Sequence, residues 1–321
     1  MRFLAVNSVQ HVFAWVYIIA LNNGVFYSVF FRIPVFKKTK KLRIAINNTS
    51  SLHLIQPKIK LQEGTMVYSA DKVSPSFLRN GPLYPTEFQI QEKLPVIETY
   101  LIKDTDTRVL AVPVYDSTDV SSKLLNRMFE DFNQEIITGG TYPQYERFAN
   151  IQDYTGYWFN SFCCILIKKP DNIDKSKIFE YIKNDEFKVD WEDNYLGTFY
   201  IKPNYVGRCS QVCNAGFFVP VAHRSKKIGY RLGQIYLKYA PKLGYSQSIF
   251  NLVYTSNIGS WKTWDKLKFA RIGVVPKVAI LGANQKAIEG ESVKKYKYEY
   301  TDAYIYSKDL LSIEEELFND M

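Results

Sequence analysis

A short basic segment, Ala222–Gly229, carries the groups best suited to bind an anion. It reads Ala-His-Arg-Ser-Lys-Lys-Ile-Gly and joins an apolar, strand-like run (Phe217–Val221) to a segment with helical periodicity. A helix that starts here directs unpaired backbone N–H groups and the positive end of its dipole at the turn. The cations Arg224, Lys226 and Lys227 lie in the same turn. This combination is typical of a pyrophosphate-binding site.

Polar residues in neighbouring strand-like segments could bind a second ligand beside this turn. Asn214 and Asn251 lie in such segments, although asparagine is disfavoured in strands. Two of them on central strands favour a binding role over two satisfied strand residues. An amide can donate two hydrogen bonds to a carboxylate or accept one from an amine. His223 could serve as a general base, but packing or a phosphate contact is the plainer role.

The composition fits a globular protein and argues against a nucleic-acid-binding domain. Of 321 residues, 46% are hydrophobic and 23% are charged, and the formal net charge is +9. Residues 1–65 hold nine basic residues and one acidic residue, which leaves 32 basic and 31 acidic residues in the remaining 256. The body is therefore almost neutral, and we expect no nucleic-acid partner.

Four cysteines are too few for a disulfide scaffold in a chain of this length. Cys209 and Cys213 could form half of a metal site, but no second Cys/His pair follows and the chain has only three His. We therefore expect no metal and free thiols in a reducing compartment, which indicates a cytoplasmic protein.

Residues 1–65 have a different character from the rest. Phe3–Phe31 contains no Asp, Glu, Lys or Arg, and a basic cluster, Lys37–Arg43, follows. The run is long enough to cross a bilayer, but polar residues and an Asn22-Asn23-Gly24 turn signal interrupt it. We interpret this region as a disordered extension or a mis-assigned start, with Met66 as the true start. A membrane anchor is the alternative, and it is the only route by which we expect a membrane association.

Hydrophobic periodicity predicts one α/β domain with a mixed sheet in the remaining chain. The charged segment 170–192 is predicted to be a solvated excursion, the charged segment 285–299 to be an insertion, and residues 313–321 to be an acidic tail. Strands are predicted at 107–115, 162–167, 196–201, 212–219, 248–254, 271–275 and 300–306, the last closing the sheet, and helices at 120–137, 225–239 and 259–267.

This order of elements, with Arg-x-x-x-x-Gly before a helix, resembles the GNAT acetyltransferases. In that family the loop pattern is (Gln/Arg)-x-x-Gly-x-(Gly/Ala), and it cradles the pyrophosphate of acetyl-CoA. Arg224 matches the first position and Gly229 the last, whereas Lys227 stands where glycine is usual. The resemblance implies a central twisted mixed sheet flanked by helices, with the acetyl-CoA-binding core at about 196–276.

The chain also resembles a small fungal group within this superfamily, the yeast L-azetidine-2-carboxylate (proline-analogue) N-acetyltransferases. The likeness covers roughly residues 66–312, and it supports Met66 as the start, because members begin shortly before the Leu-Arg-Asn-Gly-Pro motif. The motifs that carry the likeness are Leu78–Pro82, Thr141–Gln144, Leu196–Tyr205, Arg208–Ser210, Cys213–Phe217, Ala222–Arg224, Gly229–Leu232, Ala240–Tyr245, Ser248–Val253, Ser260–Leu267 and Lys308–Leu310.

The resemblance also implies the site residues. Asn214 and Asn251 would be the catalytic pair that orients the substrate, and Asn257 and Phe217 would line the same pocket. Many GNAT enzymes have a strand Glu as base and a later Tyr as acid, where this chain has Asn214 and Trp264, and neither can act as acid or base. The residues expected at acetyl-CoA are Phe218, Val219, Val221, Arg224, Ser225, Lys226, Lys227, Ile228, Gly229, Tyr230, Asn257 and Trp264.

Three functions remain open from the sequence. The first is an acetyl-CoA-dependent N-acetyltransferase of a small cyclic imino acid that detoxifies it or protects against stress, cytosolic and homodimeric as the resemblance implies. The second has the same fold and acts on a protein, a peptide or another small amine. The third is a non-catalytic acetyl-CoA-binding protein or a membrane-tethered regulator.

Overall fold

The computed structural model describes residues 13–22, 25–34, 81–82, 93–104, 106–282 and 300–321, and divides the chain into two compact units, Met1–Gly64 and Thr65–Met321. In the first unit, strands β1 (Phe13–Asn22) and β2 (Val25–Pro34) pair antiparallel. The described residues contain no helix with the length and apolarity to cross a membrane. Met66, the basic cluster 37–43, most of the 78–82 motif and the 285–299 excursion lie outside the described residues.

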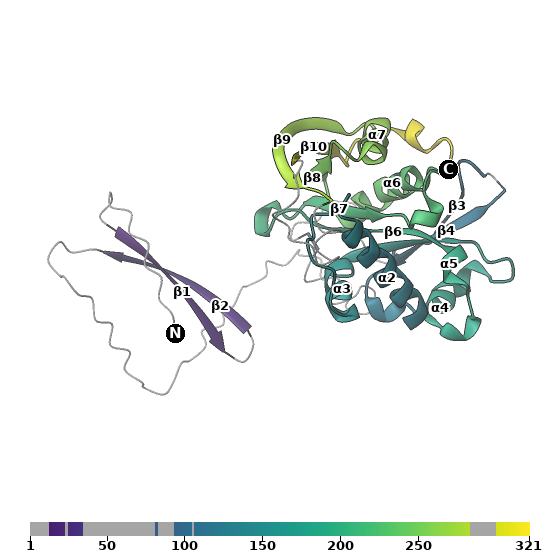
Figure 1. The fold of residues 1–321 in the computed structure, drawn as a ribbon, viewed down its shortest axis with the longest axis horizontal. Coiled ribbons are helices and arrows are strands. Elements are labelled where there is room, and N and C mark those ends of the chain that lie inside the picture. The colour runs from purple at the N-terminus through teal and green to yellow at the C-terminus, as the bar shows by residue number, and fades with distance from the viewer. Residues whose placement is uncertain (1–12, 23–24, 35–80, 83–92, 105, 283–299) are drawn as a thin grey trace, which may run out of the picture. The chain divides into compact units, whose positions relative to one another are not determined.

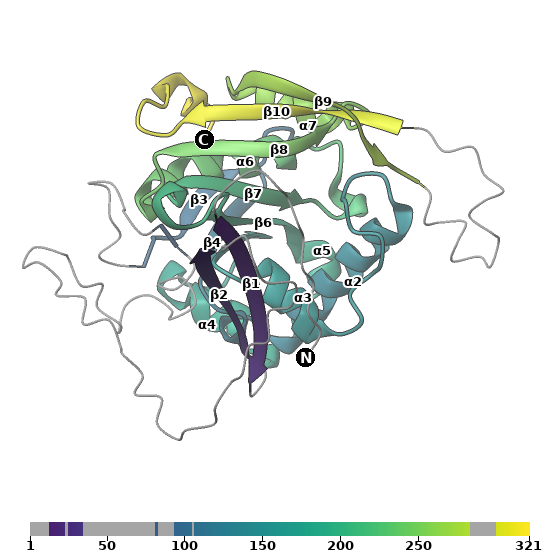
Figure 2. The same ribbon diagram turned by 90° about the vertical axis from the view of Figure 1, so that its left-hand side faces the viewer.

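The second unit is built on one eight-stranded mixed sheet in the order β3-β4-β5-β6-β7-β8-β10-β9, which confirms the predicted sheet (Figure 2). Its neighbours pair antiparallel except β7 and β8, which are parallel. The strands are β3 (Ile97–Tyr100), β4 (Arg108–Val114), β5 (Phe162–Lys168), β6 (Tyr195–Pro203), β7 (Val212–Phe218), β8 (Gln247–Tyr254), β9 (Ala270–Ile280) and β10 (Tyr300–Asp309).

Helices cover both faces of this sheet (Figure 1). Side chains of α2 (Ser122–Thr138), α3 (Ile151–Trp158), α4 (Ile178–Lys183) and α5 (Trp191–Asn194) form one apolar cluster with the strands. Side chains of α6 (Ile228–Tyr239) and α7 (Ile258–Lys266) form a second cluster against the other face. We call these the α2 face and the α6 face.

Local sequence signals set the ends of several helices. Ser121 caps α2, because its hydroxyl accepts a hydrogen bond from the Leu124 N–H, and Gly139 ends the helix in the left-handed region at φ 68°. After α6, Pro241 opens a short 3₁₀ turn and Gly244 closes it at φ 88°. Both glycines have backbone angles that residues with a Cβ rarely adopt.

The structure corrects four predicted details. The run 217–221 is not all strand, because β7 ends at Phe218 and Val221 begins a 3₁₀ helix. The helix predicted from Ser225 begins at Ile228. The segment 170–192 is not merely a solvated excursion, because α4 buries Ile178 and Ile182 completely. β10 does not close the sheet but lies between β8 and β9. In addition, β3 and α3 were not predicted.

The acidic C-terminal residues pack against α6. Buried Arg231 donates from Nε to the Tyr100 carbonyl (3.0 Å) and from a terminal nitrogen to the Asp320 carbonyl (2.5 Å). The Gln234 side-chain amide donates to the Leu317 carbonyl (2.6 Å) and to the Asp320 carboxylate (2.5 Å) of the same segment. Residues 313–321 therefore pack with the body, so a loose tail is ruled out for this segment.

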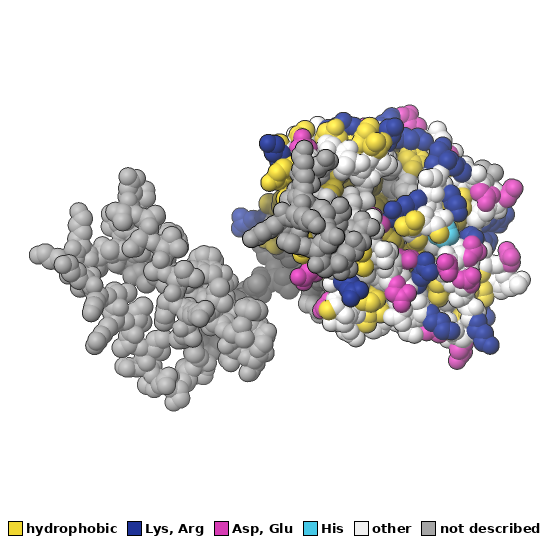
Figure 3. All heavy atoms as spheres, in the orientation of Figure 1, with side chains coloured by type: hydrophobic (Ala, Val, Ile, Leu, Met, Phe, Trp, Pro, Cys, Tyr) yellow, Lys and Arg dark blue, Asp and Glu magenta, His cyan; other side chains and the backbone are white. Residues whose placement is uncertain are grey.

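Charged side chains of both signs are interspersed over the face of the second unit seen in Figure 3. This agrees with the nearly equal numbers of basic and acidic residues in 66–321. That face carries no continuous patch of basic side chains, which nucleic-acid binding would need.

Candidate functional site

The basic turn before α6 has a strained backbone. Ser225 (φ 64°) and Lys227 (φ 62°) both lie in the left-handed region, where a residue with a Cβ costs roughly 1–2 kcal/mol. Lys227 therefore has a backbone conformation that glycine adopts more readily than other residues. Such strain occurs at ligand-binding clamps. The fold keeps the cradle shape although the glycine is absent.

The first turn of α6 presents unpaired donors. No side chain caps this helix, and its first internal hydrogen bond runs from the Arg231 N–H to the Lys227 carbonyl (3.1 Å). The N–H groups of Ile228, Gly229 and Tyr230 consequently have no partner within the helix. A Cβ added to Gly229 would meet nothing within 4 Å, so a ligand can approach the backbone there. The turn fits a pyrophosphate.

The Arg224 side chain connects the turn to α2. Its Nη2 bonds Oε2 of Glu135 (2.5 Å), a side chain of α2 that is only 4% exposed, and its Nε donates to the Val219 carbonyl (3.0 Å). The Thr141 hydroxyl donates to the other oxygen of the same carboxylate (2.5 Å). Arg224 therefore anchors the turn to α2. Its expected contact with acetyl-CoA stays a prediction.

Two further side chains fasten the turn. His223 is buried, and its Nε2 lies 3.0 Å from the Glu192 carbonyl at α5. Lys103, which follows β3, donates to the Ser225 carbonyl (2.7 Å). The sequence did not single out Lys103 or Glu135, because they lie more than 80 residues away from the turn. His223 packs at the turn, as expected from its plainer role.

The parallel strands β7 and β8 are paired only at their starts. The register joins Val212 to Gln247 and Cys213 to Ser248, although β7 continues to Phe218 and β8 to Tyr254. Beyond these pairs, the facing backbone groups are available for hydrogen bonds to an extended ligand. The Phe217 carbonyl has one partner, the Tyr142 hydroxyl at 2.7 Å. The unpaired stretch leads from the turn before α6 toward the asparagines.

The asparagines have separate partners. Asn214 lies opposite Lys202 of β6, and its side-chain oxygen accepts from the Ala215 N–H (2.8 Å). The amides of Asn251 and Asn204 form a reciprocal pair, with N···O distances of 2.6 and 3.3 Å. Among the described residues, no side-chain hydrogen bond joins Asn214 to Asn251, and their joint role at the substrate stays a prediction. Asn204 was missed because it lies in a loop after β6.

A β-bulge in β8 sets the position of Asn251. Val253 lies opposite Tyr304 and Phe250 opposite Tyr306, so Asn251 and Leu252 together face one residue of β10. Bulges redirect side chains and occur beside active sites. Alternation along β7 places Asn214 on the α2 face, because Cys213 packs against Tyr236 of α6 on the opposite face.

The other predicted site residues fall into two groups. Phe217 and Trp264 contact each other on the α6 face with ring centroids 4.7 Å apart, and the Trp264 indole N–H donates to Ser260 (3.0 Å). Asn257 caps α7 through the Ser260 N–H (3.2 Å). Their contact with a ligand stays a prediction. Of the remaining expected cofactor residues, Phe218, Ile228 and Tyr230 are buried, Val219 is half-buried, and Val221, Ser225, Lys226 and Lys227 are exposed.

Tyrosines border the α2 face of the site. A cavity of about 250 Å³ is lined by Tyr142, Leu252 and Tyr254 among others. Burial raises the pKa of Tyr142 and, to a lesser extent, that of Tyr254, so these phenols stay protonated at neutral pH. The Tyr157 and Tyr200 hydroxyls lie 3.2 Å apart in the same region.

Thiols and metal ligands do not define the site. Cys163, Cys164, Cys209 and Cys213 are free, and burial raises the pKa of Cys213 to about 12, which keeps this thiol protonated. Within the described residues, no group of three or more His, Cys, Asp or Glu side chains could hold a metal ion.

Comparisons with known proteins identify relatives. No family model matches the chain. The N-acetyltransferase aca1 of Schizosaccharomyces pombe is 37% identical over 221 residues, which cover 66% of this chain and 94% of the relative. Protein SPT10 of Saccharomyces cerevisiae is 29% identical over 211 residues, but the match spans 57% of this chain and only 33% of that protein.

Solved structures of low identity also match. A GCN5-related N-acetyltransferase from Kribbella flavida has a TM-score of 0.45 at 19% identity, and the match covers 62% of this chain and 97% of that one. An N-acetyltransferase from Staphylococcus aureus has a TM-score of 0.43 at 16% identity, with 62% and 98% covered.

Proposed function

The chain belongs to the GNAT N-acetyltransferase superfamily, and we propose that it transfers the acetyl group of acetyl-CoA to the secondary amine of a small cyclic imino acid, represented by L-azetidine-2-carboxylate. The observation that carries the proposal is that β7 and β8 stop pairing after their first residues, and that polar groups lie at both ends of the unpaired stretch. Free N–H groups of α6 lie at one end, and the side-chain amides of Asn214, Asn251 and Asn204 lie toward the other.

The turn before α6 is suited to hold the pyrophosphate of acetyl-CoA. The N–H groups of Ile228, Gly229 and Tyr230 would donate to it, and Lys226 and Lys227 are exposed beside them. Negative charge at a helix N-terminus is stabilised by these donors and the helix dipole together. When bound, acetyl-CoA would supply the thioester carbonyl that the substrate amine attacks, so that the new C–N bond replaces the C–S bond and the CoA thiolate leaves.

Asn214 and Asn251 would orient the acceptor. Amides donate to a carboxylate or accept from an amine, but they do not titrate at neutral pH. Catalysis therefore relies on proximity and on oriented hydrogen bonds, and the proton released by the amine leaves through water. Since each asparagine has a partner in the fold, its side chain is held in place before the substrate binds.

The test is an acetyl-transfer assay with the full chain, acetyl-CoA and L-azetidine-2-carboxylate, in which released CoA thiol is measured. Asn214→Ala and Asn251→Ala should each lower kcat by at least about 100-fold while acetyl-CoA binding stays within about twofold. Asn319→Ala, an exposed asparagine at the C-terminus, is the matched control.

Two results would count against this proposal. Unchanged rates in both variants would remove the assigned roles of the asparagines. Acetylation of peptide amines without any turnover of imino acids would refute the substrate class, although the superfamily would stand. The homodimer and the cytosolic location stay predictions. Light scattering of the purified chain and fluorescence microscopy of a tagged chain test them.

A further inference from the structure

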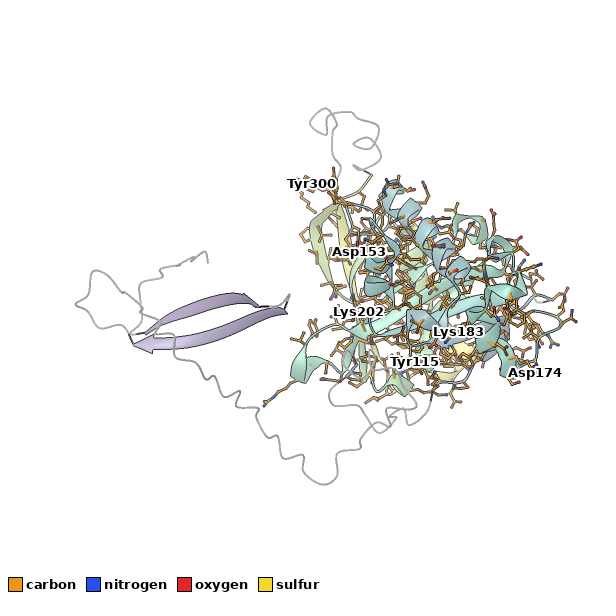
Figure 4. All side chains as sticks on the ribbon, turned by 90° about the horizontal axis from the view of Figure 1, so that it is seen from below. Tyr115, Asp153, Asp174, Lys183, Lys202 and Tyr300 are labelled. Carbon is orange, nitrogen blue, oxygen red and sulfur yellow. The ribbon has the colours of Figure 1, made fainter. Side chains whose placement is uncertain are left out.

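Lys202 places a cation on the α2 face beside the asparagines. It lies on β6 directly opposite Asn214 of β7 in the antiparallel register. Opposite residues of an antiparallel pair project from the same face, with Cβ atoms about 5 Å apart. Asn204, the partner of Asn251, follows Lys202 by two residues. The strand register and the Asn251–Asn204 hydrogen bond therefore bring the ammonium group and the three amides to one part of the sheet, where Figure 4 labels Lys202.

The ammonium group of Lys202 has aromatic neighbours in place of a counter-ion. Its Nζ lies 5.0 Å from the ring centroid of Tyr157 and 4.9 Å from that of Tyr200. In the part of the chain that the structure describes, no carboxylate forms an ion pair with it. Other half-buried cations of the domain, such as Lys169 and Arg127, have carboxylate partners at 2.7 and 2.9 Å.

This environment favours an anionic ligand. Taking a cation out of water is costly without a paired charge, and two ring faces compensate only in part. Burial accordingly lowers the pKa of Lys202. An anion bound at Nζ would restore the missing charge and favour the ammonium form.

The rings hold the lysine in a defined place. The Tyr157 hydroxyl, from α3, lies 3.2 Å from the Tyr200 hydroxyl, and the two rings meet edge to face at 5.6 Å. A Cβ on Gly216 would lie 2.4 Å from the Tyr200 ring, so the glycine gives that ring its space. A preorganised cation loses little entropy when its ligand binds.

The phosphates of acetyl-CoA are poor candidates for this anion. The donors at the start of α6 serve them, and α6 packs on the opposite face of the sheet from Tyr157 and Tyr200. The acceptor substrate is the remaining source of negative charge. An acceptor whose carboxylate contacts Lys202 would place its nitrogen close to the asparagine amides.

We propose that Lys202 binds the carboxylate of the acceptor and thereby restricts the enzyme to amines that carry a neighbouring carboxylate. This inference rests on the proposed function and deepens it, because it names the residue that reads the acid group. An ammonium group can donate up to three hydrogen bonds, so one carboxylate satisfies it while the rings stay in contact.

The experiment compares each acid with its neutral amide. The full chain is assayed with L-azetidine-2-carboxylate and L-azetidine-2-carboxamide, as wild type, Lys202→Met and Lys202→Arg. For Lys202→Met we expect kcat/KM to fall about 30-fold or more with the acid and less than about threefold with the amide, mainly through KM. Lys202→Arg should restore most of the preference for the acid.

A matched control comes from α6. Lys238 also stacks on a ring, that of Phe318 at 4.7 Å, but it lies in the last turn of the helix. Lys238→Met should leave the ratio of acid to amide turnover unchanged. Acetyl-CoA affinity should stay within about twofold in all variants, because a general loss of fold would lower it.

The inference is overturned if Lys202→Met lowers kcat/KM equally for the acid and the amide, since that outcome indicates a structural or general-base role. It is also overturned if Lys202→Met lowers kcat/KM for neither substrate. A wild-type enzyme that releases no CoA with azetidine-2-carboxylate refutes the proposed function separately. The inference is then judged on the acid and amide forms of proline, alanine and glycine. Failure of the wild type to favour the acids in that panel also overturns it.

Discussion

Lys227 offers a direct test of the strained turn before α6. It has a left-handed backbone (φ 62°, ψ 18°) and an exposed side chain beside the free N–H groups of the helix. Replacement by Gly removes both the charge and the strain, whereas replacement by Ala removes only the charge. The difference between Lys227→Gly and Lys227→Ala therefore isolates the backbone.

The size of this difference follows from two opposing effects. A Cβ in the left-handed region costs roughly 1–2 kcal/mol in the folded state. Glycine offsets part of this gain, because it increases the entropy of the unfolded chain and thereby lowers the free energy of unfolding by roughly 0.4–1 kcal/mol. Lys227→Gly should thus be more stable than Lys227→Ala by about 1 kcal/mol, which corresponds to a Tm about 2–4 °C higher for a domain of this size.

Loss of the Lys227 charge should weaken acetyl-CoA binding equally in both variants. An exposed cation near a phosphate contributes about 0.7 kcal/mol, so acetyl-CoA should bind about threefold more weakly to each. Thermal unfolding without ligand and calorimetric titration with acetyl-CoA measure the two effects. A Lys227→Gly variant that melts no higher than Lys227→Ala would refute the claim of backbone strain. A similar loss of affinity in both would still support the charge effect.

Two further predictions concern packing around the site. Arg224→Met leaves the buried Glu135 carboxylate without its cation and should cost about 3 kcal/mol of unfolding free energy. Glu135→Gln leaves a half-exposed guanidinium and should cost about 1 kcal/mol. Urea unfolding of both variants compares these losses, and the reverse order would contradict this account. Gly216→Ala forces a Cβ against the Tyr200 ring and should cost about 1–3 kcal/mol while raising KM for the acceptor more than for acetyl-CoA; equal KM changes would argue that Tyr200 does not shape the acceptor site.

Periodicity was sufficient to locate most of the sheet and the main helices. Apolar alternation and Val-rich runs marked β4, β5 and β8 within one or two residues, and Gly139 marked the end of α2. The charged segment around α4 was misjudged, although Ile178, Tyr181 and Ile182 are spaced three and four residues apart. That spacing is helical, but six residues are too few to stand out among charges.

Backbone conformation at the turn could not be read from residue types. The residue type of Lys227 does not indicate a left-handed angle, because that region is populated mainly by glycine; only the glycine usual at this position of the resembled loop pattern hints at it. Tertiary contacts impose it: Arg224 is fixed to α2, and Ser225 accepts a hydrogen bond from Lys103. These anchors also explain why the predicted helix begins later than its sequence pattern suggested.

The sequence by itself determined the order of the main strands and helices, the basic turn before α6 and the presence of asparagines in two central strands, because each depends on residues that are near neighbours in the chain. Only the tertiary structure decided which side chains meet. Asn204 pairs with Asn251 across 47 residues, and Lys202 comes to lie beside Asn214 through the register of β6 and β7. Strand order and the choice of neighbouring strands arise from packing of the whole sheet, and the alternation within a single strand does not name its partner.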